Sequence, residues 1–89
     1  GPAGCGEKWL FLDLDLSILG QPAPTYVAYA AAIRAEYAHV EEGAYRAGRR
    51  RVLESFLSRP SIFQTTRWHQ AWEAQARSNI RQELLALGG

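Results

Sequence analysis

The chain has a single cysteine, Cys5, among its 89 residues. One cysteine cannot form an internal disulfide, and no signal-like segment is visible, so the sequence does not favour a small secreted scaffold. A strong charge of either sign is also missing, because 10 Lys and Arg side chains nearly balance 9 Asp and Glu side chains. Such a chain has no global field to attract nucleic acid or an anionic membrane, and its apolar runs are too short to span a bilayer. We expect an intracellular protein, located in the cytoplasm.

The remaining composition is that of a folded protein, with 47% hydrophobic and 21% charged residues. A chain of this length forms one small domain with a modest core. Gly1 and Pro2 resemble the remnant of a cleaved tag, and we interpret residues 1–8 as a leader or tag remnant. Residues 9–89 are expected to form a single helical domain.

Two carboxylates, Asp13 and Asp15, interrupt the apolar stretch 9–20. Burying an ionised Asp costs several kcal/mol unless it is paired, hydrogen-bonded or bound to a metal. The leucines alternate as in a half-buried strand, but Leu12, Leu16 and Leu19 also form a helical stripe. We favour a helix, because no later segment is a suitable partner strand.

Three later segments have apolar residues at helical spacing, namely 26–40, 42–58 and 67–87. Thr25 is expected to cap the first of them, and Thr65 or Thr66 the last. Alanines from Ala28 to Ala38 raise the helix propensity of the first segment and permit a neighbour to approach closely. The sequence therefore predicts an all-α fold of about four helices in a small helical bundle.

The segment FLDLDLSILG (11–20) resembles the Asp-x-Asp-Leu-x-x-Leu-Gly signature of a family of predicted metal-dependent phosphohydrolases of the HD-domain superfamily. Further similar segments follow in the same order: Tyr26, Tyr29, IRAEY (33–37), YRAGR (45–49), VL (52–53), FL (56–57), IF (62–63) and ARSN (76–79). The similarity covers the C-terminal part of that family and implies part of an HD-domain-like fold.

The same resemblance implies a divalent metal, such as manganese or magnesium, in the full-length family. Either Asp13 or Asp15 would be its last ligand. The family's other ligands are a His and an adjacent His-Asp pair, and this chain has no His-Asp dipeptide. Its two histidines, His39 and His69, follow the Asp signature, whereas the family's metal histidines precede it. We therefore expect no cofactor and no catalytic competence in this chain alone.

Polar side chains on the later segments are candidates for substrate contacts or for structural pairing. They are Arg34, Glu36, Tyr37, Arg49, Glu73, Arg77 and Asn79. An Arg can hold a phosphate through its bidentate fork, yet Arg34 is also suited to an ion pair with a Glu of another helix. The others can pair across the bundle and fix its register, and Glu73 and Arg77 are i,i+4 neighbours. The i,i+4 spacing of His69 and Glu73 suits two metal ligands, but no third ligand is evident, and surface pairing is favoured.

A short basic cluster consists of Arg46, Arg49, Arg50 and Arg51. It could contact phosphates of nucleic acid, but Glu41, Glu42 and Glu54 dilute its charge. A solvated helix face is the favoured interpretation, and nucleic acid is not an expected partner.

Two functions follow as hypotheses. The favoured one is a helical interaction or oligomerisation module that resembles the C-terminal part of an HD-domain phosphohydrolase. The alternative is a fragment of such an enzyme that supplies one metal-ligand Asp and part of a substrate pocket. If the helices evolved to pack on a missing N-terminal half, an apolar face is exposed and needs a partner, which predicts a homodimer or a hetero-complex. The residues expected on that face are Trp9, Phe11, Tyr26, Tyr29, Trp68 and Trp72.

Overall fold

The computed structural model describes residues 16–88. These residues form a short 3-10 helix, η1 (Leu16–Gly20), and three α-helices, α2 (Ala23–Glu36), α3 (Glu42–Leu57) and α4 (Thr66–Ala86). No strand occurs between residues 16 and 88. The expectation of a small all-α bundle is confirmed for this part of the chain, although it holds three α-helices where about four were expected. The relation to an HD-domain fold stays a prediction.

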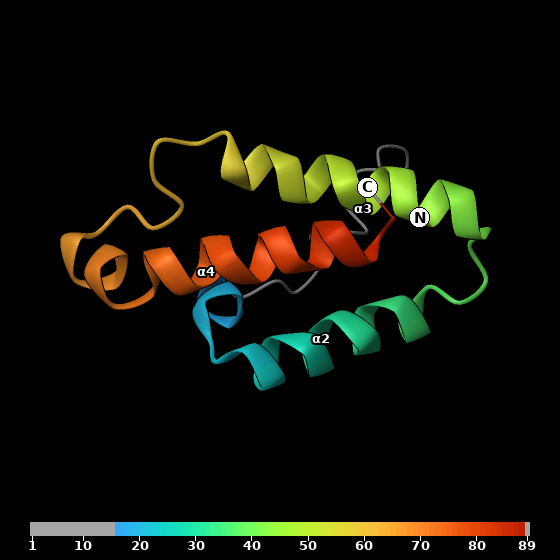
Figure 1. The fold of residues 1–89 in the computed structure, drawn as a ribbon, viewed down its shortest axis with the longest axis horizontal. Coiled ribbons are helices and arrows are strands. Elements are labelled where there is room, and N and C mark those ends of the chain that lie inside the picture. Colours follow the sequence, from blue (N-terminus) through green and yellow to red (C-terminus); the bar gives the residue numbers. More distant parts are fainter. Residues whose placement is uncertain (1–15, 89) are drawn as a thin grey trace, which may run out of the picture.

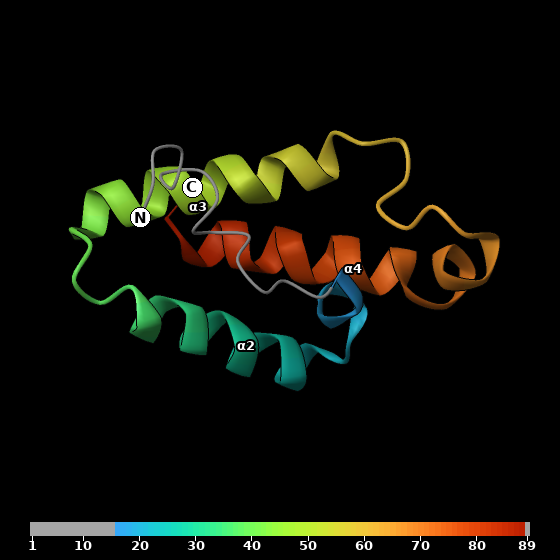
Figure 2. The same ribbon diagram turned by 180° about the vertical axis from the view of Figure 1, so that it is seen from behind.

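Helix α4 lies between α2 and α3 in both views of the ribbon (Figure 1, Figure 2). Helix α2 runs in the same direction as α4, and α3 runs in the opposite direction (Figure 1). The antiparallel register of α3 is fixed by Arg46, which donates to the Leu87 carbonyl at 3.4 Å, and by Arg77, which donates to the Leu57 carbonyl at 3.1 Å. Both ends of α3 are thus tied to the central helix.

The first segment differs from the helix expected over 9–20. Only Leu16–Gly20 of it is described, as one 3-10 helix, and residues 9–15 lie outside the described part of the chain. Gly20 lies so close to Trp72 that a Cβ at position 20 would overlap the Trp72 Cβ and lie 2.9 Å from its Cγ. The Asn79 side-chain amide then donates to the carbonyls of Leu19 at 2.9 Å and of Gln21 at 2.8 Å. Because Gly20 has no side chain, η1 can pack directly on Trp72, and the two hydrogen bonds from Asn79 then hold η1 against α4.

Helix α2 begins earlier than the sequence suggested. Its N-cap is Pro22 and its first residue is Ala23, so Thr25 lies inside the helix and does not cap it. A cap at Thr25 would leave Pro24 outside the helix. A proline in the first turn is compatible with a helix, because the N–H groups there have no intrahelical acceptor.

Helix α2 also ends earlier, at Glu36 instead of near Val40. The Arg34 guanidinium donates to the Tyr37 carbonyl at 2.8 Å and to the Val40 carbonyl at 3.3 Å. These hydrogen bonds satisfy carbonyls that follow the last turn, and they allow the chain to turn toward α3.

Side-chain caps start the other two helices. The Glu41 carboxylate accepts from the backbone N–H groups of Gly43 at 2.8 Å and Ala44 at 3.0 Å. These two bonds lower the pKa of Glu41. The Thr65 hydroxyl accepts from the Trp68 N–H at 3.3 Å, which confirms the expected cap of α4.

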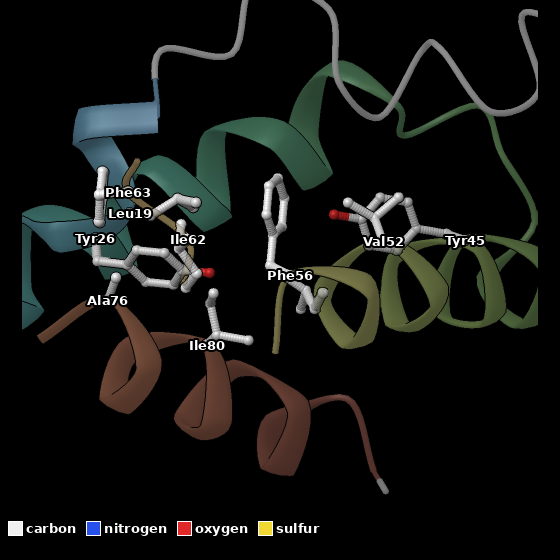
Figure 3. Close-up of a cluster of buried hydrophobic side chains, with 10 residues drawn as sticks. Leu19, Tyr26, Tyr45, Val52, Phe56, Ile62, Phe63, Ala76 and Ile80 are labelled. Atoms are coloured by element: carbon white, nitrogen blue, oxygen red, sulfur yellow. The ribbon is translucent and has the colours of Figure 1, made fainter. Parts of the chain in front are cut away.

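The core is built from all four elements and from the loop between α3 and α4 (Figure 3). The loop contributes Ile62 and Phe63, which are both buried. The other buried apolar residues are Leu19, Tyr26, Tyr45, Val52, Leu53, Phe56, Ala76 and Ile80.

Candidate functional site

The most deeply buried charge is Arg49 of α3, which is only 1% exposed. Its guanidinium pairs with the Glu83 carboxylate of α4 through two contacts, Nε to Oε2 at 2.8 Å and Nη2 to Oε1 at 3.0 Å. Two parallel N–H···O bonds of this kind offset part of the desolvation cost of a buried charge. The pair joins α3 to α4 at the centre of the bundle.

Two tyrosines of α2 complete this network. The Tyr26 hydroxyl donates to Glu83 Oε1 at 2.5 Å, and Arg49 Nη2 donates to the Tyr29 hydroxyl at 3.3 Å. Burial, and next the nearby Glu83 carboxylate, raise the pKa of Tyr26. Burial alone would lower the pKa of Arg49, but the hydrogen bonds and the charge of Glu83 outweigh it, so the Arg49 pKa is raised. The Arg49 guanidinium therefore stays charged and the Tyr26 phenol stays protonated.

This network is closed on itself. Every buried side-chain nitrogen and oxygen atom among the described residues has a hydrogen-bond partner. The carboxylate of Glu83 is shared between Arg49 and Tyr26 and accepts three hydrogen bonds from them. The side chains of Tyr26, Tyr29, Arg49 and Glu83 thus join α2, α3 and α4, and we call these four residues the polar clamp.

A second buried carboxylate, Glu73 of α4, organises the loop between α3 and α4. It is 7% exposed. It accepts from the Ile62 N–H at 3.0 Å, from the Phe63 N–H at 3.1 Å and from Arg77 Nε at 2.8 Å. Burial works to raise the pKa of Glu73, but the two backbone N–H groups and the Arg77 guanidinium lower it below its ordinary value. The predicted i,i+4 pairing of Glu73 with Arg77 is confirmed.

His69 lies beside this cluster at the surface. Its Nδ1 atom is 3.3 Å from Glu73 Oε1 and 2.6 Å from the Ser61 hydroxyl. The favoured interpretation of His69 and Glu73, pairing near the surface, agrees with this geometry. Both side chains help to attach the loop to α4.

The predicted group Arg34, Glu36 and Tyr37 lies at the end of α2. Arg34 pairs with Glu42 of α3 at 2.9 Å and stacks over the Tyr45 ring, with 4.4 Å between the guanidinium carbon and the ring centroid. Glu36 is exposed, and Tyr37 is half-buried at the C-cap. The ion pair between Arg34 and a Glu of another helix is thereby confirmed.

The basic cluster of α3 is largely paired with carboxylates. Arg46 contacts Glu42 at 2.6 Å, and Arg50 lies 3.8 Å from Glu54. Arg49 is buried against Glu83, so its positive charge does not lie at the surface. The interpretation of this cluster as a solvated helix face agrees with the exposure of Arg46 and Arg51 but not with the buried Arg49.

An apolar groove runs between α2 and α4. Its main hollow has a volume of about 490 Å³ and is lined by Ala23, Tyr26, Val27, Ala30, Asn79, Gln82, Glu83 and Ala86. A neighbouring hollow of about 390 Å³ continues toward α3 and shares Val27, Ala30, Glu83 and Ala86 with the first. We call these two hollows together the α2–α4 groove. Its aliphatic lining residues are Ala23, Val27, Ala30, Ala31, Ala86 and Leu87, and polar residues lie among them.

The outward side of α2 continues this apolar surface. Of the nine exposed residues of α2, only Thr25 and Glu36 are polar. Val27 is 63% exposed and borders the groove. We call Val27, Ala28, Ala31, Ala32 and Ala35 the α2 surface; all five are exposed. Contiguous apolar residues on the exposed side of a helix often mark a contact surface.

The residues expected on an exposed apolar face are distributed differently. Trp9 and Phe11 lie outside the described residues. Tyr26 is buried in the core and Tyr29 is half-buried in the polar clamp, so they do not form an open face. Trp68 is 49% exposed, and the half-buried Trp72 stacks on it with 5.6 Å between the ring centroids.

The α2 surface is not among the partner faces predicted from the sequence, which consist of aromatic residues. The signal for it is the run of alanines on α2, which also favours a helix and permits a neighbour to approach closely. The size of an aromatic residue does not predict its exposure here, because the hydroxyl groups of Tyr26 and Tyr29 form hydrogen bonds with Glu83 and Arg49 inside the bundle.

The predicted metal ligands Asp13 and Asp15 lie outside the described part of the chain. Within residues 16–88, no group of three or more His, Cys, Asp or Glu side chains is placed to hold a metal ion. Of the remaining predicted polar residues, Arg49, Glu73, Arg77 and Asn79 all bind other parts of the bundle.

None of the helices described here combines the length and the apolar character needed to cross a bilayer. The chain was also compared with known proteins. No family model, no curated protein and no solved structure matches it.

Proposed function

We propose that this chain is a helical interaction or oligomerisation module, and that it associates through the α2 surface and the α2–α4 groove. The observation that supports this proposal is the apolar character of the exposed side of α2, where only Thr25 and Glu36 are polar. Covering such a surface with a partner removes apolar area from water, which is favourable at about 25 cal/mol per Å².

The chemistry of the groove favours a protein partner over a polar small molecule. The Asn79 amide nitrogen already donates to two carbonyls, and its oxygen accepts from Gln75 at 2.8 Å. The Glu83 carboxylate is engaged by Arg49 and Tyr26. With these polar atoms in use, the groove offers mainly apolar contact, which suits the side chains of a helix.

The proposed interaction module is consistent with the resemblance of this sequence to the HD-domain phosphohydrolases. In this view the chain keeps the helical arrangement of their C-terminal part, and association takes the place of packing against a catalytic half. A homodimer or a hetero-complex would both satisfy this requirement.

The alternative proposal is a metal-dependent phosphohydrolase fragment in which Asp13 or Asp15 supplies one ligand. It rests on the resemblance. A phosphomonoesterase assay with added manganese, run on the chain and on Asp13→Asn and Asp15→Asn, separates the two proposals. Phosphate release that requires manganese and is lost in at least one of the two variants would favour the phosphohydrolase fragment.

The interaction module is tested by light scattering on a concentration series of the wild-type chain and two variants. Val27→Glu places a charge on the α2 surface, whereas Leu85→Glu places the same charge at a residue that is 70% exposed but borders a different hollow, with Arg50 and Arg81. We expect the wild-type chain and Leu85→Glu to associate as concentration rises and Val27→Glu to stay monomeric. Both exposed substitutions should change the free energy of unfolding by no more than about 0.5 kcal/mol.

A wild-type chain that remains strictly monomeric at high micromolar concentration would contradict the proposal. Association that is equally strong in Val27→Glu would also contradict it, because a buried unpaired charge at the contact is costly.

A further inference from the structure

We propose that the partner on the α2 surface is a second copy of this chain, packed so that the two α2 helices run antiparallel across a two-fold axis. In this arrangement Val27 of each copy enters the α2–α4 groove of the other. The inference rests on the proposed function, since it names the occupant of the same surface.

The shape of the surface is the first argument. Val27 is 63% exposed and borders a hollow whose lining includes the small side chains of Ala23, Ala30 and Ala86 beside the larger Tyr26, Asn79, Gln82 and Glu83. A projection and a hollow that lie next to each other on one surface become complementary when the surface meets its own copy through a two-fold axis. One patch then supplies both the projecting side chain and its receptor.

The size of the side chains is the second argument. Ala28, Ala31, Ala32 and Ala35 present only methyl groups on the exposed side of α2. Interaxial distances of 8 to 10 Å depend on the side chains at the contact, and methyl groups permit the shorter distances. The long side chain of Arg34, which lines the second hollow, is held by Glu42 and by the Tyr37 and Val40 carbonyls.

The distribution of charge favours the antiparallel direction. The first turn of α2 has no acidic residue, and its N-cap, Pro22, makes no side-chain hydrogen bond to the helix. The first turn of α2 and its cap therefore supply no side chain that would compensate the partial positive charge of this helix end. At the other end, Glu36, Glu41 and Glu42 outnumber the nearby Arg34 and Arg46. An antiparallel pair brings the acidic end of one copy toward the positive end of the other.

The length of α2 limits the strength of the contact. A helix of 14 residues is about 21 Å long at 1.5 Å per residue. One helix pair with its groove buries roughly 1,000 Å² in total, which is at the low end of specific interfaces. We therefore expect a dissociation constant in the micromolar range.

Cross-linking tests both the occupant and the direction. In a Cys5→Ser background, Ala23→Cys and Ala35→Cys place single thiols near the two ends of α2. In an antiparallel pair, position 23 of one copy lies near position 35 of the other, whereas two copies of the same position are separated by about 18 Å along the axis. With a short bismaleimide, an equimolar mixture of the two variants should give about tenfold more covalent dimer than either variant alone.

The control is Leu85→Cys in the same background, mixed with Ala35→Cys, which should give no more dimer than Ala35→Cys alone. Strong cross-linking of Ala23→Cys to itself and of Ala35→Cys to itself would indicate parallel helices and overturn the proposal. If the wild-type chain associates in a Val27-dependent manner but the thiols do not cross-link in any combination, the antiparallel dimer is wrong and the proposed function stands. If no association occurs, the proposed function itself fails.

Discussion

The pair formed by α3 and α4 and the single helix α2 differ in how their polar residues are used. Helices α3 and α4 place charged residues on both their inner and outer sides: Arg49 pairs with Glu83 inside, while Arg46 and Arg50 pair with glutamates outside. Helix α2 places the phenols of Tyr26 and Tyr29 on its inner side, and its exposed residues are apolar apart from Thr25 and Glu36.

This difference indicates which surfaces the chain completes by itself. On α3, the exposed residues are mostly Arg, Glu, Ser, Gly and Ala, and this face is suited to water. On α2, the inner side is satisfied by the polar clamp, but the outer side has too little polar character for a permanently solvated helix. Among residues 16–88, α3 and α4 expose mainly polar residues besides Trp68 and Leu85, whereas the outer side of α2 exposes mainly apolar ones.

The largest expected effect comes from breaking the polar clamp that joins the two regions. Glu83→Ala leaves the Arg49 guanidinium buried without its carboxylate and removes the acceptor of the Tyr26 hydroxyl. We expect the free energy of unfolding to fall by about 3 to 5 kcal/mol. Urea denaturation followed by circular dichroism measures this change.

The matched comparison is the double variant Arg49→Met with Glu83→Leu, which removes both charges together. It should be considerably more stable than Glu83→Ala, because no uncompensated charge remains. If the double variant and Glu83→Ala are equally unstable, the loss arises from packing and the buried charge is not its cause.

A smaller effect is expected at the loop between α3 and α4. Glu73→Gln weakens the hydrogen bonds to Ile62, Phe63 and Arg77, and should cost about 1 to 3 kcal/mol at neutral pH. The pKa of Glu73 is lowered in the folded chain, so its contribution is fully present above the ordinary value of 4.5 and is lost as the pH falls through the folded-state value. The stability difference between wild type and Glu73→Gln should therefore shrink on acidification.

Glu54→Gln is the control for this titration. Glu54 is exposed and lies 3.8 Å from Arg50, so its removal should change stability by about 0.5 kcal/mol or less. A difference between wild type and Glu73→Gln that stays constant from pH 7 down to pH 3 would contradict the assigned role of the ionised carboxylate.

Much of the fold could be predicted from the sequence, because the helical stripes are long and regular. Helix α3 was expected over 42–58 and α4 over 67–87, and each observed helix ends within one residue of these limits. The start of α2 could not be predicted from Pro24, since a proline is compatible with a first turn and incompatible only with later ones. Its end depended on Arg34, whose side chain reaches carbonyls beyond the helix.

The candidate site was less accessible to sequence reasoning. Arg49 is among the predicted pairing residues, but its partner Glu83 could not be predicted, because a contact 34 positions away depends on the register of two helices. The residues of the α2 surface were visible as alanines, yet nothing in a periodic pattern states which side of an apolar helix the chain leaves uncovered. That information comes from the packing of α4 and η1 against α2.

The most direct test of the α2 surface is amide hydrogen exchange at a series of protein concentrations, with the peptides of α2 compared with those of α3. Association through α2 should slow the exchange of α2 amides as concentration rises and leave the amides of α3 unchanged, and Val27→Glu should abolish the slowing. Exchange that is independent of concentration in both helices, or that slows equally in both, would contradict the claim that α2 is the unfinished side of this molecule.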